Sequence, residues 1–415
     1  MTAFDERALF ITDFARRLHL AGVSAARLEG AVKTTATRLG VDCAIWSSPT
    51  GILLSLGDLN DPAVGQQTRV LRLDPAEPNL ADLSTLDHVA EQVIEGRLDV
   101  KEATKRFREL DRVSETRDTA WTVFAFGLAS AAVAGLLRTS WFDIVVAGAL
   151  GTVIGAVVVT SRSRPHLAAA ADAIAAILAT VLAAAFAHFV APLSIQTVVI
   201  AALIVLMPGL TLTTAITELA TGQLVTGTAR FAGAMVTLFK LTFGSVAGAQ
   251  IVNALGWSPR VAQSMALPAL VEVVATLAAA FSFAILFKAA RRDIPLVMVS
   301  AVMGYVLTRV ASTWFVPVQP VLGITFAGGV FFSSLVMAAV ANVYGRVARR
   351  PGTLVRLPSI MLLVPGSVGF RSLASLVERD YTLGMDTAVA VLSALVALTA
   401  GLLFGSVLVA PRRYL

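Results

Sequence analysis

The sequence predicts an α-helical polytopic membrane protein, with about ten transmembrane helices arranged as two inverted five-helix repeats behind an N-terminal cytoplasmic α+β domain. Three observations lead to this fold class. Of the 415 residues, 56% are hydrophobic and only 14% are charged, whereas a soluble globular chain has about 25% charged residues. Apolar runs of nearly membrane-spanning length follow one another from residue 121 onward. Several short motifs also recur at an offset of 157 residues.

Residues 1–118 differ in composition from the rest of the chain and are predicted to form a soluble domain. They contain 15 basic and 19 acidic residues, a net charge of −4, while the remaining residues contain 18 and 8, a net charge of +10. Phe10, Phe14 and Leu18 recur at helical spacing, which indicates an amphipathic first helix. The prediction is completed by a second helix over 21–39, strands over 42–46, 52–56 and 69–73, and a helical segment over 80–116.

The apolar part of the chain contains ten segments that we expect to cross the membrane. The fourth and ninth are short, and each ends in Pro-Gly. In order, the segments are 121–137, 142–160, 166–190, 194–207, 231–252, 263–287, 294–311, 319–344, 355–364 and 386–410.

Basic residues are distributed unevenly between these segments. If the N-terminus is cytoplasmic, the cytoplasmic loops contain most of them, as the positive-inside rule requires, and both termini lie inside. Arg371 and Arg379 fall on the opposite side and weaken the bias. The basic residues assigned to the cytoplasmic side are Arg162, Arg164, Lys288, Arg291, Arg292, Arg346, Arg349, Arg350, Arg356, Arg412 and Arg413.

An internal repeat is the most informative feature of the sequence. Pro208-Gly209 and Pro365-Gly366 are 157 residues apart, and three further glycine pairs share the register: Gly227 with Gly384, Gly244 with Gly401, and Gly248 with Gly405. A repeat of five spans, an odd number, must enter the membrane from opposite sides in its two copies, here 119–257 and 258–415. Matching spans interrupted by proline and glycine indicate a substrate site in transporters of this architecture. The alternative is that Pro-Gly only ends a helix in a loop.

The chain resembles the bacterial threonine/serine exporter family (ThrE-type) over essentially its whole length. The resembling stretches are RLHLAGVSAARLEGAVKTTATRLGV, MPGLTLTTAITELATGQLVTGTARFAGAM, LLVPGSVGFRSLASLV and AGLLFGSVLVAPRR. In the second stretch the family pattern has an acidic residue that is more familiar as Asp, so Glu218 is a mild departure. The resemblance implies ten spans, a cytoplasmic N-terminal domain, a bacterial plasma-membrane location, and export of L-threonine and L-serine driven by the proton gradient.

A hydroxy amino acid presents a carboxylate, an ammonium and a hydroxyl group. Helix N-termini after Pro208-Gly209 and Pro365-Gly366 offer free N–H groups for the carboxylate. Arg371 lies near the second and is expected either to contact the carboxylate or to anchor the helix at the membrane interface. The hydroxyl side chains that follow each Pro-Gly can either cap the helix or bind the hydroxyl group of the cargo, and capping is the commoner role. These side chains are Thr211, Thr213, Thr214 and Ser367.

Proton coupling requires an ionisable side chain in the membrane, where such groups are expensive and usually functional. Glu272 is the most deeply placed by sequence, in MALPALVEVVATL, and the alternative is a structural partner for Lys240 or Arg309. Glu218 can serve the ammonium group or the proton, or can be an interfacial loop charge. Lys240 lies in the middle of a predicted span and is expected to pair with Glu272 or Glu218, or to snorkel.

The sequence therefore predicts a secondary active exporter of small hydroxy amino acids, a proton antiporter that is not an enzyme. The expected partners are the amino acid, the proton and the lipid bilayer; no nucleic acid and no cofactor are expected, and the sequence leaves a homo-oligomer open. Cys43 is the single cysteine, and no phosphate-binding or nucleophile motif appears. Two alternatives stay open: a membrane enzyme whose chemistry lies in residues 1–118, and a passive channel.

Overall fold

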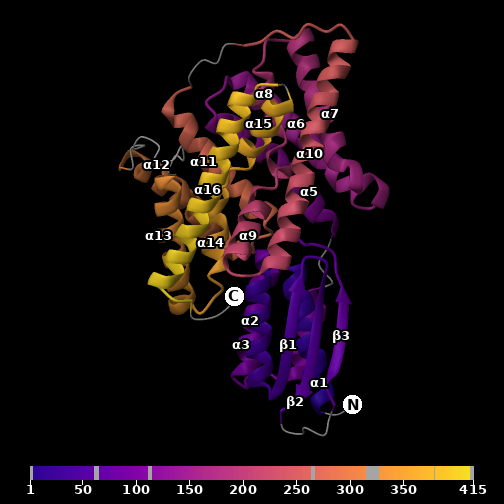
Figure 1. The fold of residues 1–415 in the computed structure, drawn as a ribbon, viewed down its shortest axis with the longest axis vertical. Helices are drawn as coiled ribbons and strands as arrows, with labels where there is room; N and C mark the ends of the chain where they lie inside the picture. Colours follow the sequence, from indigo (N-terminus) through magenta and orange to yellow (C-terminus); the bar gives the residue numbers. More distant parts are fainter. Residues whose placement is uncertain are drawn as a thin grey trace.

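The computed structural model describes residues 3–59, 65–110, 115–262, 267–314, 327–377 and 379–411. An N-terminal α+β region lies at one end of a bundle of long helices (Figure 1). Parts of the sixth and eighth predicted spans, and the tail residues Arg412 and Arg413, fall outside the described residues.

The N-terminal region packs helices against one face of a small antiparallel sheet of order β1-β2-β3. Its apolar core contains the stacked rings of Phe10, Phe14 and Phe107, and the helical spacing of the first segment is confirmed. In its described part, the predicted helical segment over 80–116 contains α3 and α4 as two separate helices, and Gly96 with φ +69° lies between them. The elements are α1 (Ala3–Leu20), α2 (Ala25–Arg38), β1 (Val41–Ser48), β2 (Gly51–Asp58), β3 (Gln67–Arg72), α3 (Leu80–Ile94) and α4 (Val100–Glu109).

The bundle contains the predicted spans. Within the described part of the chain, nine helices are long and apolar enough to cross a membrane, and a pair of helices bent by 52° makes a tenth. In order the elements are α5 (Glu115–Leu136), α6 (Trp141–Ser161), α7 (Pro165–Phe189), α8 (Ile195–Ala202), η2 (Ile204–Leu206), α9 (Gly209–Ala220), α10 (Leu224–Ala254), α11 (Ala269–Leu286), η3 (Arg291–Asp293), α12 (Ile294–Trp314), α13 (Gly328–Ala348), α14 (Thr353–Met361), α15 (Gly366–Val377) and α16 (Tyr381–Leu408).

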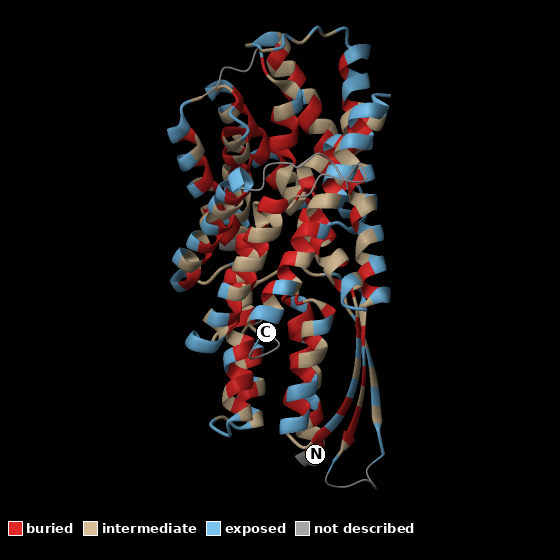
Figure 2. Ribbon diagram, turned by 60° about the vertical axis from the view of Figure 1, so that its left-hand side comes forward, coloured by how far each residue is buried: buried red, intermediate tan, exposed pale blue. Residues whose placement is uncertain are grey.

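The outer faces of the bundle are exposed and apolar. Figure 2 shows exposed residues on the outside of the long helices and buried residues within. Large hydrophobic side chains such as Val145, Phe243 and Val396 are more than half exposed. A contiguous apolar surface of this size is unfavourable in water, and helices that satisfy their own backbone groups are suited to lipid. The chain is therefore a multi-pass membrane protein.

The two halves of the bundle pack their helices in corresponding ways. α9 and α15 begin and end 157 residues apart. Gly244 of α10 lies against Ala173 and Ala176 of α7. Gly401 of α16 lies against Phe331 and Ser334 of α13. Gly244 and Gly401 therefore allow close helix packing.

The two Pro-Gly elements meet inside the bundle. A Cβ atom on Gly209 would lie 3.2 Å from both the Cα and the N of Gly366, so the two backbones are in contact. From this contact α9 extends toward the N-terminal region, whereas α15 lies near the opposite end of the bundle (Figure 1). The first Pro-Gly follows the 52° bend, while 353–377 passes as one candidate span. Neither Pro-Gly simply ends a helix in a surface loop.

Hydrogen bonds hold the N-terminal region to the bundle. The backbone N–H of Leu80 donates to the carbonyl of Phe287 at 2.9 Å, at the end of α11. Arg350 binds both carboxylate oxygens of the buried Asp293 at 2.7 Å and also donates to Ser84 of α3 at 3.0 Å. These contacts fix the position of the N-terminal region against the end of the bundle formed by the C-terminal end of α11 and by Arg350.

Candidate functional site

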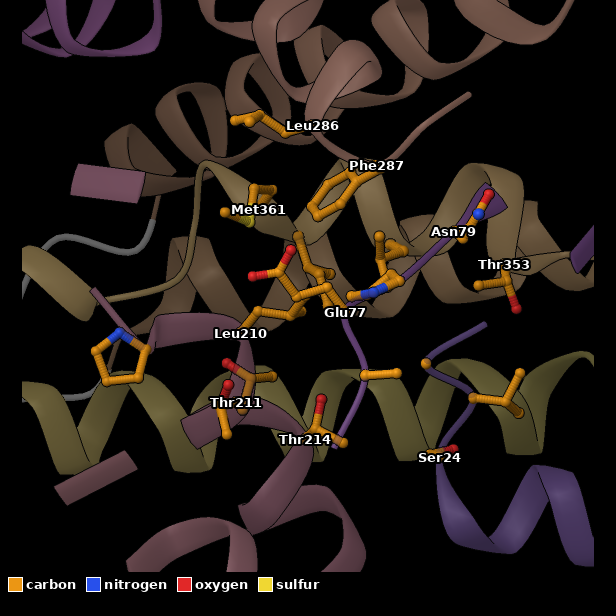
Figure 3. Close-up of a pocket in the computed structure, with 18 of the residues that line it drawn as sticks. Ser24, Glu77, Asn79, Leu210, Thr211, Thr214, Leu286, Phe287, Thr353 and Met361 are labelled. Carbon is orange, nitrogen blue, oxygen red and sulfur yellow. The ribbon is translucent and has the colours of Figure 1, made fainter. Parts of the chain in front are cut away.

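A cavity of about 940 Å³ lies where the N-terminal region meets the bundle. Its walls come from the start of α2, the segment before α3, and helices α9, α11 and α14. In Figure 3, Ser24, Glu77 and Asn79 of the N-terminal region share this pocket with Thr211 and Thr214 of α9. Phe287 and Met361 close it on the side opposite α9 (Figure 3). The cavity has room for a small amino acid with its water shell.

Three threonines of α9 line this cavity, and their hydroxyl groups have no intramolecular partner in the described part of the chain. The Thr213 hydroxyl is buried and makes no hydrogen bond, and those of Thr211 and Thr214 have none among the described residues. Thr217 is different, since its hydroxyl donates to the carbonyl of Thr213 at 2.8 Å. Pro208 occupies the N-cap position and no side chain caps the helix, so the hydroxyl groups of Thr211 and Thr214 are available to a ligand.

Glu218 lies one turn further along α9, on the same wall. Its side chain is 3% exposed, and Oε2 lies 3.1 Å from Nε of Arg230. The Arg230 N–H does not point at this oxygen, so the contact is an ion pair without hydrogen-bond geometry. Oε1 accepts a hydrogen bond at 3.1 Å from the backbone N–H of Ala25, at the start of α2. This carboxylate thus links α9, α10 and the N-terminal region, and it is not an exposed loop charge.

The site residues predicted in the second repeat copy do not line this cavity. Pro365 and Gly366 lie behind the contact with Gly209, and Gly209 itself faces that contact and not the cavity. Ser367 is half-buried on α15, and Arg371 is exposed. The structure therefore gathers Pro208, Thr211, Thr213, Thr214 and Glu218 in one place and leaves the second-copy residues elsewhere.

Lys240 does not pair with Glu272 or Glu218, so that prediction is wrong. Its Nζ lies 3.7 Å from Oδ2 of Asp172 and donates to the carbonyl of Ala169 at 3.0 Å. The reason is that α10 packs along α7, which places Asp172 beside it. Asp172 lines the cavity, whereas Lys240 stands behind it.

Glu272 lies at the far end of the bundle and not in the middle of a span. Pro268 delays the start of α11, so that Glu272 occupies its first turn. The carboxylate accepts a hydrogen bond from Tyr305 at 2.7 Å, lies 3.1 Å from Arg309, and makes a short contact with Arg138. Glu272 is thus a structural partner of Arg309, as the alternative prediction had it, although Lys240 takes no part in this cluster.

The sequence analysis missed several charged residues of the cavity, among them Glu77 and Arg356. Glu77 reaches the cavity from the segment before α3, and its Oε2 lies 3.6 Å from Nη2 of Arg162. Arg356 lies on α14 and lines the cavity. Arg356 was taken as one more loop charge, while Glu77 gave no signal because only the fold brings residues 75–79 to the bundle.

A second cavity, of about 620 Å³, lies within the N-terminal region between α1 and α4. Its titratable groups include Glu6 and Asp13, which face Lys101 at 3.1 Å and Arg17 at 2.9 Å. The described residues that line it include no histidine, cysteine or serine. Thr104, which also lines this cavity, donates its hydroxyl group to the carbonyl of Val100 at 2.9 Å.

Comparisons with known proteins agree with this architecture. A family model described as "Putative threonine/serine exporter" matches residues 9–252, and a second, described as "Threonine/Serine exporter, ThrE", matches residues 272–408. No solved structure matches.

The relatives found are fungal. The chain is similar to the pheromone-regulated membrane protein 10 of Debaryomyces hansenii, with 25% identity over 377 residues, 88% of this chain and 36% of the relative. The proteins of the same name from Candida albicans (strain SC5314) and Yarrowia lipolytica are 24% and 23% identical, over 88% of this chain and 33% and 30% of their own lengths. The chain thus spans about a third of the length of the curated relatives it matches. Because the two family models together cover both halves of the molecule, the chain belongs to the threonine/serine exporter family.

Proposed function

We propose that the protein exports small hydroxy amino acids, L-threonine and L-serine, by proton antiport. The observation that carries this proposal is the wall of α9, where the unbonded hydroxyl groups of Thr211 and Thr214 and the carboxylate of Glu218 line a cavity in a protein of the exporter family. Hydroxyl groups can donate to and accept from the hydroxyl group of the cargo. A site built from such groups rejects analogues that lack the matching hydroxyl, because its buried polar atoms would then be left unpaired.

Alternating access would be provided by residues 119–257 and 258–415 acting as inverted repeats. The matched extents of α9 and α15, their direct contact at Gly209 and Gly366, and their positions toward opposite ends of the bundle support this arrangement. The protein would sit in the plasma membrane with residues 1–118 and both termini in the cytoplasm. The cavity then faces the cytoplasm, where an exporter loads its cargo.

Glu218 is the proton-coupling residue we favour. It is the buried carboxylate on the cavity wall, and both its oxygens hold contacts that a proton would weaken, to Arg230 and to the N-terminal region. Glu272 remains the second candidate, although two arginines surround it at the far end of the bundle.

Proteoliposome flux tests the proposal. Labelled threonine or serine should accumulate when a pH gradient of the correct sign is imposed, and collapse of the gradient should abolish the accumulation. Glu218→Gln should uncouple flux from the gradient while unforced exchange of labelled for unlabelled threonine continues. Threonine uptake that ignores the pH gradient would refute proton coupling, and a downhill leak without accumulation would favour the channel alternative.

A further inference from the structure

The cavity has more positive than negative charge on its walls. Its described lining contains five basic residues and three acidic residues, the latter being Glu77, Asp172 and Glu218. Each of these carboxylates already faces a cation, namely Arg162, Lys240 and Arg230 respectively. An anionic group entering the cavity therefore meets cations whose charge is not fully compensated.

Arg356 is the basic residue that stands out among the five. Arg162 and Arg230 face carboxylates, and Arg27 donates to the hydroxyl of Thr353 at 2.7 Å. Lys288 is exposed at the end of α11. The guanidinium of Arg356 is half-buried in the wall and has no hydrogen-bond or ion-pair partner in the described part of the chain.

The repeat shows that the fold does not require a cation at this position. Under the 157-residue offset Arg356 corresponds to Val199 of α8, which is buried and 5% exposed. The corresponding position in the first copy is therefore occupied by an apolar side chain. An unpaired charge in an otherwise apolar helix is costly, and in a membrane protein it usually marks a functional site.

We propose that Arg356 binds the carboxylate of the transported amino acid, with Arg27 of the N-terminal region beside it as a weaker second cation. This proposal deepens the proposed function and rests on it. The planar guanidinium matches a carboxylate in a two-point geometry that a lysine cannot reproduce. Thr353 and Arg356 are three residues apart on α14 and share one helix face, so the Arg27–Thr353 hydrogen bond brings Arg27 to the same wall. The cargo is then held by its carboxylate at α14 and by its hydroxyl at α9.

The test compares ligands with and without the carboxylate. Threonine is set against its amino alcohol, in which the carboxylate is replaced by a hydroxymethyl group, as competitors of labelled threonine exchange in proteoliposomes. The wild-type protein should prefer threonine by about ten- to a hundredfold, the usual range for a charge-assisted hydrogen bond. Arg356→Gln should lose this preference, and Arg356→Lys should keep part of it.

Two further variants serve as comparisons. Arg27→Gln should reduce the preference less than Arg356→Gln, because Arg27 is already bonded to Thr353. Arg291→Gln removes a cation that is exposed and does not line the cavity, so it should keep the wild-type preference. If Arg356→Gln does not transport, stabilisation of the purified protein against heat by threonine and by the amino alcohol gives the same comparison without flux.

The outcomes separate this inference from the proposed function. A wild-type protein that neither transports nor binds threonine refutes the proposed function. A wild-type protein that transports threonine, together with an Arg356→Gln variant that keeps the full preference for the carboxylate, overturns the inference alone. Equal losses for threonine and for the amino alcohol in Arg356→Gln also overturn it, since they indicate a structural role.

Discussion

Substitution of Gly244 by alanine tests the packing of the bundle most directly. Gly244 lies in the interior of α10, where a Cβ atom would meet the Cβ of Ala176 at 2.7 Å and would lie closer still to the carbonyl oxygen of Ala173. Both are on α7, and the backbone oxygen cannot turn aside as a flexible side chain can. α10 and α7 must therefore move apart, and overpacking of this kind costs about 1–3 kcal/mol.

A matched control lies on the same helix. Gly233 has nothing within 4 Å of an added Cβ atom. Alanine in place of glycine raises helix propensity by up to about 1 kcal/mol in each variant, so this gain cancels when Gly244→Ala is compared with Gly233→Ala. The remaining difference is the clash alone, about 1–3 kcal/mol against α7.

The measurement is the thermal unfolding midpoint of the purified variants in detergent. A loss of 1 kcal/mol lowers the midpoint by about 2–4 °C in a domain of 150–250 residues, so Gly244→Ala should melt at least about 2 °C below Gly233→Ala. Gly401→Ala should behave like Gly244→Ala, because its Cβ atom would run into Phe331 and Ser334 of α13. Equal midpoints for Gly244→Ala and Gly233→Ala would show that α10 does not approach α7 as described.

Two further predictions concern the N-terminal region. Burial raises the pKa of the Cys43 thiol to about 11, so at pH 8 only about one thiol in a thousand is ionised. Cys43 should accept iodoacetamide slowly in the native protein and readily after denaturation, as mass spectrometry would show; fast native labelling would contradict its burial. Burial, and secondarily the charge of Arg230, lowers the pKa of His19 below its ordinary value of 6.5. The unfolded chain then binds more protons, so stability falls as the pH drops through 6.5, and His19→Gln should lessen the loss of stability between pH 7.5 and pH 5.5; an unchanged loss would contradict this.

Local patterns in the sequence predicted most of the fold. The hydropathy pattern predicted the spans because a helix needs about 20 apolar residues to cross a lipid bilayer. The Pro-Gly pairs located α9 and α15, since each of these helices begins at the glycine of its pair. The hydroxyl side chains Thr211, Thr213 and Thr214 were found in this way, and the structure brings them to one cavity with Glu218.

Partners in space were harder to predict, since they depend on which helices pack together. Lys240 pairs with Asp172 because α10 lies along α7, and no spacing in the sequence gives that neighbour. Glu272 was placed too deep because the apolar run before it continues through Pro268, where a helix can begin but not pass unbroken. Arg356 was assigned to a loop, although α14 begins three residues earlier at Thr353.

The helices that follow the two Pro-Gly pairs, α9 and α15, differ in chemistry, and this difference bears on the proposed transport cycle. Thr211, Thr214 and Glu218 of α9 correspond by the offset to Val368, Arg371 and Ser375 of α15. If the protein alternates between an inward-facing and an outward-facing state by exchanging the conformations of its two halves, α15 would face the outward path in the way that α9 now faces the cavity. The outward path would then lack the counterparts of Thr211 and the buried carboxylate Glu218. Under the proposed mechanism, a path with Val368 and Ser375 in place of Thr211 and Glu218 would bind the hydroxyl and ammonium groups of the cargo less well on the outside than on the inside, and this would favour release over rebinding.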